Sequence, residues 1–569
     1  MKKILSIVFC LLTGTAFIQS CKNDDLLNLQ NPQAYNPSEV WRDQNLANAY
    51  LVDIYASLPG WPVNQGDYAD ESTNILGPDY VTTSNAAFKY WPYATIRKIN
   101  ILLTEIDGGT LPEAFKNSLK GQAHFLRAFH YFKAVVYHGG VPILAKPQQL
   151  TDSLSVARNS TAECFAFILQ DLDNAIKMLP DKFTGADFGR MDKAVATAFK
   201  GRVQLYKASP QFNPSNPYSN SFWADAYTAT KAAKTFLEGL GYGLYPDYAG
   251  IWMNERNQEG VMTVIYQNPG RVNGRQEHCI RPLAQSKNCT GADNPVWELV
   301  AQYPMKDGKQ PGTSAKYPYN VQTFWQNRDP RFDATIAYNG SVFPLGVRAD
   351  YRLYTDLQLG GLIDGFGPGQ QYNRSGFYTR KGVDNSLPQA QVDLNAVDWV
   401  EIRFAEVLLN YAEAANETDH PDEALAVLKQ IRQRAGIEAG TDGMYGLKSG
   451  MTRTELREAI YQERFIEFAF EGKRFWDLRR ARRLADLNGK VKSGLQAQLK
   501  PGLDPNDRSK VFLPTDFTYT VRELIINGPR QMVLPESYYF FPIAQDEIEK
   551  NPNLQQNKDW GGTFDPTLR

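Results

Sequence analysis

Three separate segments of the chain repeat one helical pattern, and this pattern limits the possible folds more than any other feature. In each segment a small residue is followed by a large apolar residue four positions later and by an alanine seven positions later. The three series are Gly121, Phe125 and Ala128; Gly201, Leu205 and Ala208; and Ala405, Leu409 and Ala412. Small residues two turns apart let a second helix approach closely. An amphipathic segment follows each series, at 165–176, 226–237 and 424–431, so the pattern predicts three tetratricopeptide-like helical hairpins.

The region between residues 241 and 398 lacks this periodicity and is rich in Gly, Pro, Asn and aromatic residues. Short strands are expected at 261–266 and 334–338, with ordered loop elsewhere. Loops of this length are unusual in a compact protein unless they carry function. The predicted fold class is therefore mainly α, a tetratricopeptide-like hairpin scaffold with long ordered loops and a few short strands.

The segment 452–480 predicts a buried helix. Thr452 stands three residues before Glu455, the spacing of a capping box at a helix start. Apolar residues then occupy nearly all sides between 461 and 470, which indicates burial rather than a surface position. Gly472 is expected to end the helix.

Three glutamates lie on one face of this predicted helix, Glu463, Glu467 and Glu471. Like charges at this spacing repel unless cations neutralise them. The nearest candidates in the sequence are Arg464, Lys473, Arg474 and Arg479. We interpret the set as a structural ion-pair ladder, because the segment offers neither a nucleophile nor a set of metal ligands.

The same segment closely resembles the C-terminal signature of the SusD/RagB family of outer-membrane nutrient-binding lipoproteins. Further stretches resemble that family in the same order along the chain, at 121–144, 299–309, 328–336, 402–417 and 540–557. The resemblance implies a SusD-like fold and a protein that is not an enzyme. It also implies that the protein covers a SusC-like TonB-dependent transporter as a lid and captures oligomeric nutrient for import.

The N-terminus predicts export and a lipid anchor. Lys2 and Lys3 precede an apolar run, 4–18, that is too short for a comfortable bilayer span and fits a secretory signal. Ser20 and Cys21 resemble a lipoprotein cleavage site, so Cys21 is expected to be acylated and to hold the chain in outer-membrane lipid. The next residues, 22–25, resemble the surface-export signal of Bacteroidetes lipoproteins. We therefore expect a surface-exposed, lipid-anchored protein of the outer membrane.

These observations divide the chain into four parts. We predict a lipoprotein signal peptide at 1–20 and the acylated cysteine with a flexible, polar tether at 21–40. An N-terminal tetratricopeptide-like part follows at 41–240. The loop-rich insert and the C-terminal part, 241–569, are expected to pack as one globular unit.

The net charge argues against nucleic-acid binding, and the cysteines suggest structural roles. The formal net charge is −1, which gives no basic field for nucleic acid. Cys279 and Cys289 are close enough in sequence to pair as a loop staple in an oxidising compartment. Cys164 lies in a helical pattern and is expected to be a small buried side chain rather than a reactive thiol.

No metal or cofactor is expected. His124, His130 and His138 share one predicted helix, but their spacings of six and eight residues do not give the i, i+4 pair of a zinc helix. We interpret them as packed or half-exposed side chains. The sequence also lacks a glycine-rich phosphate loop before a helix, a nucleophile elbow and a Cys-x-x-Cys motif.

Two loop regions combine aromatic rings with polar side chains. The first contains Trp61, Asp67, Tyr68, Asp70 and Asn85, and the second contains Tyr317, Tyr319 and Trp325. An aromatic face covers the apolar face of a sugar ring, while neighbouring polar groups meet its hydroxyls. We predict that these residues bind an oligosaccharide, whereas Trp91 and Trp297 fall in family-like framework sequence and are assigned to structure.

Other functions stay open. Some relatives bind oligopeptides, which would use backbone-directed polar groups and apolar pockets. Paired carboxylates of a surface hydrolase depend on the fold and are not visible in a sequence. A scaffold without a ligand of its own is the third alternative. The aromatic, polar loops favour a glycan over a peptide, and the family resemblance argues against an enzyme.

Overall fold

The computed structural model describes residues 37–62, 65–73, 81–84, 88–273, 275, 280–287, 291–346, 348–367, 373–507, 509–524 and 531–568. The predicted signal peptide, Cys21, most of the tether, Asn85, Cys279 and Cys289 lie outside these residues. The described part is mostly helical with short strands, which confirms the predicted fold class. None of its helices is long and apolar enough to cross a membrane.

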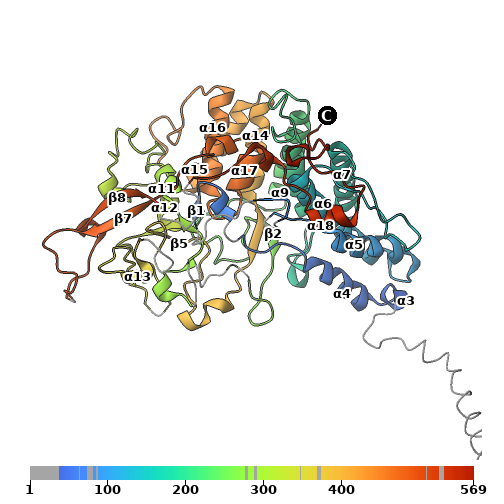
Figure 1. Ribbon diagram of the computed structural model, residues 1–569, viewed down its shortest axis with the longest axis horizontal. Coiled ribbons are helices and arrows are strands. Elements are labelled where there is room, and N and C mark those ends of the chain that lie inside the picture. The colour runs from blue at the N-terminus through green and yellow to red at the C-terminus, as the bar shows by residue number, and fades with distance from the viewer. Residues whose placement is uncertain are drawn as a thin grey trace, which may run out of the picture.

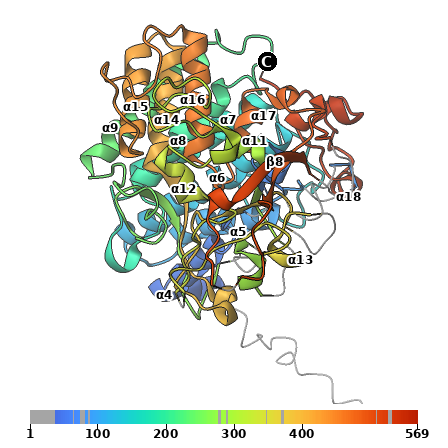
Figure 2. The ribbon, with the colours of Figure 1, turned by 90° about the vertical axis from the view of Figure 1, so that its left-hand side faces the viewer.

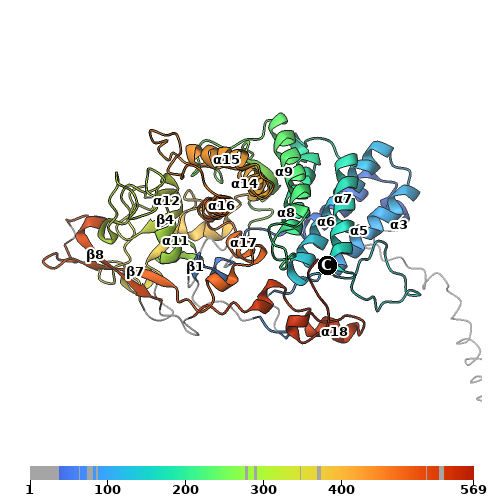
Figure 3. The same cartoon turned by 90° about the horizontal axis from the view of Figure 1, so that it is seen from above.

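The three predicted hairpins are present. They are formed by α6 (Glu113–His138) with α7 (Thr161–Met178), α8 (Lys193–Ala208) with α9 (Phe222–Gly239), and α14 (Phe404–Glu417) with α15 (Pro421–Arg434). Helix α7 also packs on α8, and α9 packs on α14, so the pairs form one continuous stack (Figure 3). The scaffold therefore runs across the predicted boundary at residue 240.

Close helix approach explains the small residues in the pattern. A Cβ atom added to Gly121 of α6 would lie 2.8 Å from Cγ of Leu179, directly after α7. The same addition at Gly201 of α8 would lie 3.3 Å from Cγ2 of Thr230 on α9. Both distances are shorter than ordinary van der Waals contact, so larger residues would push the paired helices apart.

Further helices extend the scaffold or lie in the loop-rich part. They are α3 (Pro37–Val40), α4 (Gln44–Tyr55), α5 (Tyr93–Glu105), α11 (Trp297–Gln302), α12 (Pro330–Thr335), α13 (Gly361–Asp364), α16 (Arg453–Glu467), α17 (Arg474–Arg480) and α18 (Gln545–Lys550). The capping box that predicts the start of α16 is formed. Glu455 N–H donates to Thr452 Oγ1 at 3.2 Å, and Thr452 N–H donates to Glu455 Oε2 at 2.9 Å. Helix α16 ends at Glu467, earlier than predicted, and Gly472 lies in the turn between α16 and α17.

The strands form antiparallel pairs. These are β1 (Ser72–Thr73) with β3 (Asn294–Pro295), β2 (Gly260–Val264) with β6 (Trp399–Arg403), β4 (Ile336–Tyr338) with β5 (Phe377–Thr379), and β7 (Ser493–Leu499) with β8 (Phe517–Glu523). Strand β2 overlaps the predicted segment 261–266, and β4 lies within the predicted segment 334–338. Strand β4 begins later than predicted because Asp329 caps α12 and Pro330 occupies its first turn.

Two apolar cores lie side by side and share helix α16. The larger core fills the helical stack and reaches β2 and β6, and it includes Ile460 of α16. The second core lies beneath the β7–β8 hairpin and includes Phe465 and Ile466 of the same helix. The hairpin lies at the end of the molecule away from α3 and α4 (Figure 1) and its strand β8 runs across the face seen in Figure 2. Helix α16 therefore joins the scaffold to the loop-rich part.

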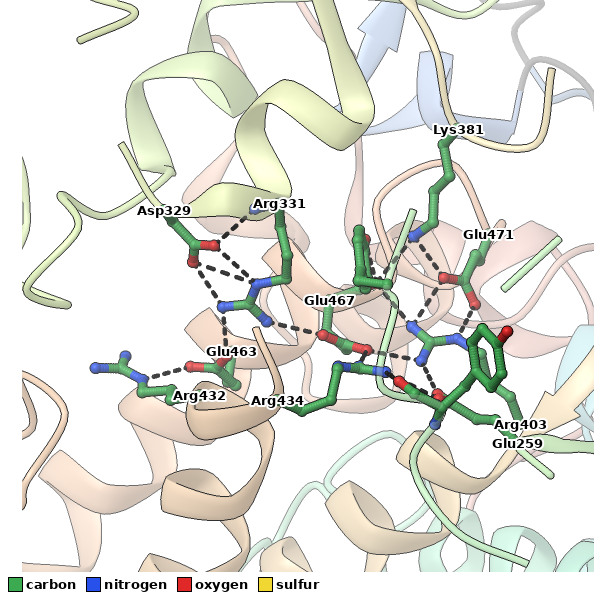
Figure 4. Close-up of polar contacts among 12 residues, drawn as sticks. Glu259, Asp329, Arg331, Lys381, Arg403, Arg432, Arg434, Glu463, Glu467 and Glu471 are labelled. Atoms are coloured by element: carbon green, nitrogen blue, oxygen red, sulfur yellow. Dashed lines mark hydrogen bonds and ion pairs between the residues drawn. The ribbon is translucent and has the colours of Figure 1, made fainter. Parts of the chain in front are cut away.

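A buried ion-pair network fixes this junction (Figure 4). Glu463 contacts Arg331 and Arg432, each at 2.7 Å. Glu467 contacts Arg331 at 2.8 Å and Arg403 at 2.7 Å, and it also pairs with Arg434. The third glutamate, Glu471, contacts Arg403 at 2.8 Å and Lys381 at 2.5 Å. The predicted ion-pair ladder is confirmed.

The predicted cations of this ladder were wrong. Arg464 contacts Asp477 at 2.9 Å, Arg474 contacts Asp70 at 2.8 Å, and Lys473 contacts Glu406 at 3.2 Å. Arg479 donates to the main-chain oxygens of Tyr538 and Tyr539, each at 2.8 Å. Arg464 lies on α16 itself and contacts Asp477 of α17, while the turn at Gly472 and helix α17 direct the other three cations to different partners.

Candidate ligand-binding cleft

A cleft of about 640 Å³ opens in the loop-rich part of the chain. Residues from four segments line it, within 252–255, 266–268, 383–387 and 394–397. Strand β2 ends just before Tyr266 and strand β6 begins just after Val397, and the register of this pair sets Val264 opposite Trp399. The antiparallel pairing therefore brings two of the four segments together. The cleft lies in the region where the sequence predicted functional loops.

Three tryptophans support the cleft from behind. The Trp252 ring, which lines the cleft, lies 4.8 Å from the Trp61 ring and 5.6 Å from the Trp399 ring, centroid to centroid. Trp61 Nε1 donates to the carbonyl oxygen of Val397 at 2.9 Å. This contact ties the loop after α4 to the lining of the cleft. Packed rings of this kind give a rigid wall, so little side-chain entropy is lost when a ligand binds.

Two buried polar atoms at the cleft lack a protein partner. Trp252 Nε1, a donor, and Asn385 Oδ1, an acceptor, have no hydrogen-bond partner among the described residues. Both residues line the cleft. An unsatisfied buried polar group costs about 1–3 kcal/mol. The two atoms therefore leave one donor and one acceptor unsatisfied in the wall of the cleft.

The charged side chains among the described lining residues are both acidic, Glu255 and Asp384. Glu255 Oε1 accepts a hydrogen bond from the N–H of Asp398 at 3.1 Å, and Asp398 Oδ1 accepts from the N–H of Tyr266 at 2.7 Å. Burial raises the pKa of Asp398 to about 6. Carboxylates accept hydrogen bonds from hydroxyls but repel acidic ligands. The lining therefore favours a neutral ligand rich in hydroxyl groups.

Apolar and aromatic surface completes the lining. Met253 is 43% exposed and Leu394 is 37% exposed, both large for apolar side chains. Tyr266 is half-buried, and the Arg271 guanidinium lies 5.0 Å from its ring centroid. Burial raises the pKa of the Tyr266 hydroxyl above its ordinary value, so the hydroxyl stays neutral and can donate. Apolar surface beside amide and carboxylate oxygens suits the two faces of a sugar ring.

The first predicted binding region is built into the interior. Trp61 is only 6% exposed and backs the cleft without lining it. Asp67 is buried and accepts from Ser72 Oγ at 3.0 Å, while Asp70 pairs with Arg474. Tyr68 packs against other aromatic rings, 4.6 Å from Phe88 and 5.6 Å from Phe475. These side chains have internal partners, and their assignment as ligand contacts stays a prediction.

The second predicted region lies outside the cleft and is half-buried. Tyr317 donates its hydroxyl to Glu438 Oε1 at 2.5 Å. Arg328 lies 5.5 Å from the ring centroid of Tyr319. Trp325 stacks on Tyr338 with ring centroids 5.9 Å apart. Tyr319 and Trp325 pack against the second core. None of the three joins the first region, and their role as ligand contacts stays a prediction.

The histidines and Cys164 behave as packed side chains. His124 Nδ1 lies 2.7 Å from Asp171 Oδ1, and His130 lies between the hydroxyls of Ser57 and Tyr90, at 2.9 and 2.6 Å. The buried Cys164 thiol donates to a main-chain oxygen, and burial raises its pKa to about 12. Within the described ranges, no group of three or more metal-ligating side chains is close enough to hold an ion.

The hairpin scaffold and the loop-built cleft are typical of a protein that binds a ligand between loops held by a rigid frame. Comparison with known families agrees with this class. The model of the SusD family matches residues 251–560, and a second model, described as starch-binding associating with outer membrane, matches residues 24–205. The chain belongs to the SusD family.

Individual relatives cover most of the chain. SusD-like protein P38 of Formosa agariphila is 22% identical over 515 residues, which are 86% of this chain and 93% of that protein. A crystal structure of a SusD-like protein from Bacteroides fragilis covers 92% of this chain and 99% of its own, with a TM-score of 0.73 and 25% identity. A SusD-like carbohydrate-binding protein from the same organism covers 91% and 100%, with a TM-score of 0.73 and 23% identity.

Proposed function

We propose that this protein binds neutral oligosaccharides at the cell surface and delivers them to a SusC-like TonB-dependent transporter of the outer membrane. The cleft carries the proposal, because its lining combines apolar surface, two unsatisfied buried polar atoms and acidic side chains. Membership of the SusD family supports it. So do the family description as starch-binding and the carbohydrate-binding relative from Bacteroides fragilis.

The apolar face and the hydroxyl groups of a sugar would contact different side chains of the cleft. The apolar C–H face of a sugar would lie on Tyr266 and the exposed side chains of Met253 and Leu394. Its hydroxyls would meet Asn385 and Glu255. Modest affinity would suffice for import, since anchoring the protein and its transporter in one membrane raises their effective concentration.

The membrane anchor is the second part of the proposal. An acylated Cys21 would hold the protein at the outer membrane without a spanning helix, because two or more acyl chains anchor a protein stably. Cys21→Ser should abolish incorporation of radiolabelled palmitate and release the protein from membranes. The lipidated protein should copurify with a TonB-dependent transporter from detergent-solubilised outer membranes. Recovery of the wild-type protein without any transporter would contradict the partnership.

A pair of tyrosine variants tests the site. Tyr266 of the cleft and Tyr317 of the second predicted region are both half-buried, and each has a cation 5.0 Å from its ring centroid. Calorimetry with a panel of neutral oligosaccharides should first identify a ligand. Tyr266→Ala should then weaken binding at least tenfold, about 1.4 kcal/mol, whereas Tyr317→Ala should change it less than twofold. Asn385→Ala should also weaken binding, because it removes the acceptor.

The same measurements distinguish the alternatives. The reverse result for the two tyrosines, or loss of binding in Trp325→Ala alone, would place the ligand at the second predicted region. Retention of peptides from a protein digest, with no saccharide bound, would refute the glycan proposal and establish the oligopeptide alternative.

A further inference from the structure

A groove of about 190 Å³ lies beside helix α4 and shares no lining residue with the ligand-binding cleft. Its walls are the second half of α4, the loop 186–190, and the end of β2 with the residues that follow it. The side chain of Val52 is 49% exposed. The apolar lining residues are Val52, Leu58, Ala186, Phe188, Val264 and Ile265. The groove therefore presents apolar surface to solvent.

Contacts between the walls fix the shape of this groove. The Tyr55 hydroxyl of α4 accepts a hydrogen bond from the N–H of Met191 at 2.8 Å, which ties α4 to the end of the loop. A Cβ atom added to Gly189 would lie 2.6 Å from Cγ1 of Ile265, so the loop packs directly on the segment after β2. The groove therefore keeps its shape without a partner.

Both charged residues that line the groove are cationic, Arg190 and Arg271. Arg190 contacts Asp187 at 2.8 Å, which balances its charge. Among the described residues, the Arg271 guanidinium has neither an ion pair nor a hydrogen bond, and it lies 5.0 Å from the ring centroid of Tyr266. One positive charge without a carboxylate partner thus stands beside the apolar surface. This combination suits an occupant that carries a carboxylate next to apolar side chains.

The chain contains a segment of this composition directly before α3. Residues 22–36 lie outside the described residues, and among them Asp24 and Asp25 are followed by Leu26, Leu27 and Leu29. Helix α3, which follows the segment, packs on α4. The segment therefore joins the described part of the chain beside the helix that forms one wall of the groove.

Length and volume both allow this segment to occupy the groove. Residues 30–36 can span about 25 Å when extended. Val52 lies about 12 Å along the helix axis from Gln44, the first residue of α4. A cavity of about 150 Å³ can hold benzene, with its six carbon atoms. The groove can therefore hold a leucine side chain, with its four carbon atoms, and part of a second one.

We propose that residues 24–29 dock in this groove, with leucine side chains on its apolar surface and an aspartate paired with Arg271. Docking would shorten the link to the membrane. Residues 22–36 span about 50 Å when extended, whereas the part before Asp24 spans about 10 Å. The docked segment would hold the protein close to the membrane in one orientation, and this consequence, unlike the docking itself, rests on the proposed acylation of Cys21.

A photo-crosslink tests the docking in the purified protein. The chain 21–569 with Cys21→Ser and with p-benzoylphenylalanine in place of Leu27 keeps a large apolar side chain at the proposed contact. After irradiation and digestion, mass spectrometry should find residue 27 joined to peptides from 52–58, 186–190 or 263–271. A crosslink to another part of the chain, a crosslink only between two copies, or no crosslink would overturn the proposal. This protein cannot be acylated at residue 21, so the result is independent of the proposed anchor.

Charge reversal tests the pairing with Arg271. Arg271→Glu should lower the crosslink yield at least fivefold, and Asp24→Lys with Asp25→Lys in the same chain should restore it. Arg42→Glu is the matched control, because Arg42 is exposed two residues after α3 and does not line the groove. The control should change the yield less than twofold. Equal yields for Arg271→Glu and Arg42→Glu would overturn the proposal, and if Arg271→Glu fails to fold, the positions of the crosslinks in the chain with Arg271 decide the question.

Discussion

Replacing Glu467 by glutamine tests whether the buried ion-pair network holds the two cores together. Glu467 is fully buried and contacts three guanidinium groups, those of Arg331, Arg403 and Arg434. Their charge lowers the pKa of Glu467 well below its ordinary value. Glutamine has nearly the same shape but leaves these cations without one of their anions. Removing one partner of a buried ion pair costs about 3–5 kcal/mol.

This free energy converts to a measurable change in melting temperature. An unfolding entropy of about 2.1 cal/mol/K per residue gives roughly 1.2 kcal/mol/K for a chain of this length, so Glu467→Gln should lower Tm by about 2.5–4 °C. Scanning calorimetry at pH 7 measures the change. A carboxylate with a lowered pKa gives its full stabilisation above its ordinary pKa and loses it only as the pH falls through the lowered value. The difference from the wild type should therefore be equal at pH 6 and pH 8.

The matched control is Glu458→Gln on the same helix. Glu458 contacts Arg483 at 2.8 Å, but its side chain is 54% exposed. An exposed ion pair contributes about 0–1 kcal/mol, so this variant should lower Tm by less than 1 °C. Equal melting temperatures for the two variants would refute the reasoning, because burial would then make no difference to the value of the ion pair.

Two further predictions concern stability. Burial is the main cause that raises the pKa of Glu71 to about 8. Between about pH 5 and pH 8 the folded state therefore retains a proton that the unfolded state releases. The stabilisation from this retained proton is lost as the pH rises from about 5 to about 8. The melting temperature of Glu71→Gln should accordingly rise relative to the wild type over that range and level off above it, and a difference independent of pH would contradict the shift. Thr452→Ala removes the cap of α16 and should cost about 0.5–2 kcal/mol in denaturant unfolding, whereas Thr454→Ala, exposed in the first turn of the same helix, should cost much less; equal costs would exclude the cap as the cause.

The helical hairpins could be predicted because their signal is local. A small residue must stand where two helices approach, and the two-turn spacing that reveals it lies within one segment. Leu179, which contacts the position of Gly121, follows the partner helix of the same hairpin. The capping box of α16 is local too, since Thr452 and Glu455 are three residues apart. Such features depend on few residues and can be predicted without knowledge of the tertiary fold.

The partners of the glutamates could not be predicted in the same way. Helical spacing predicts Glu463, Glu467 and Glu471 on one face, although Glu471 lies in the turn after α16, and it does not reveal what lies opposite. Arg331, which contacts Glu467, is 136 positions away in the sequence. The cations that are near in sequence have other partners, because Arg464 contacts Asp477 of α17 and the turn after α16 directs Lys473, Arg474 and Arg479 elsewhere. Periodicity predicts that a buried charge needs a partner, whereas the identity of a distant partner depends on the tertiary fold.

The sequence also does not predict which individual aromatic residues are exposed. Trp61 stands in a polar loop, yet it is 6% exposed and packs on two other tryptophans. Met253 has no polar group and is 43% exposed at the cleft. Loop composition therefore predicts where aromatic and polar residues gather, but not which rings are exposed. Trp252 and Tyr266 carry the same composition signal, and both lie within the insert that was expected to carry function.

The cleft depends on the register of the β2–β6 pair, which explains why it could not be predicted from the sequence alone. Tyr266 lies two residues after the end of β2, and Val397 lies two residues before the start of β6. The pairing of Val264 with Trp399 brings their segments together. Because side chains alternate along a strand, a shift of one residue would turn Trp399 away from Trp252 and Trp61. The tryptophan contacts and the strand pairing therefore stabilise the same register. The network around α16 anchors β6 through Arg403, so the loops of the cleft can differ in sequence while the strands that position them stay fixed.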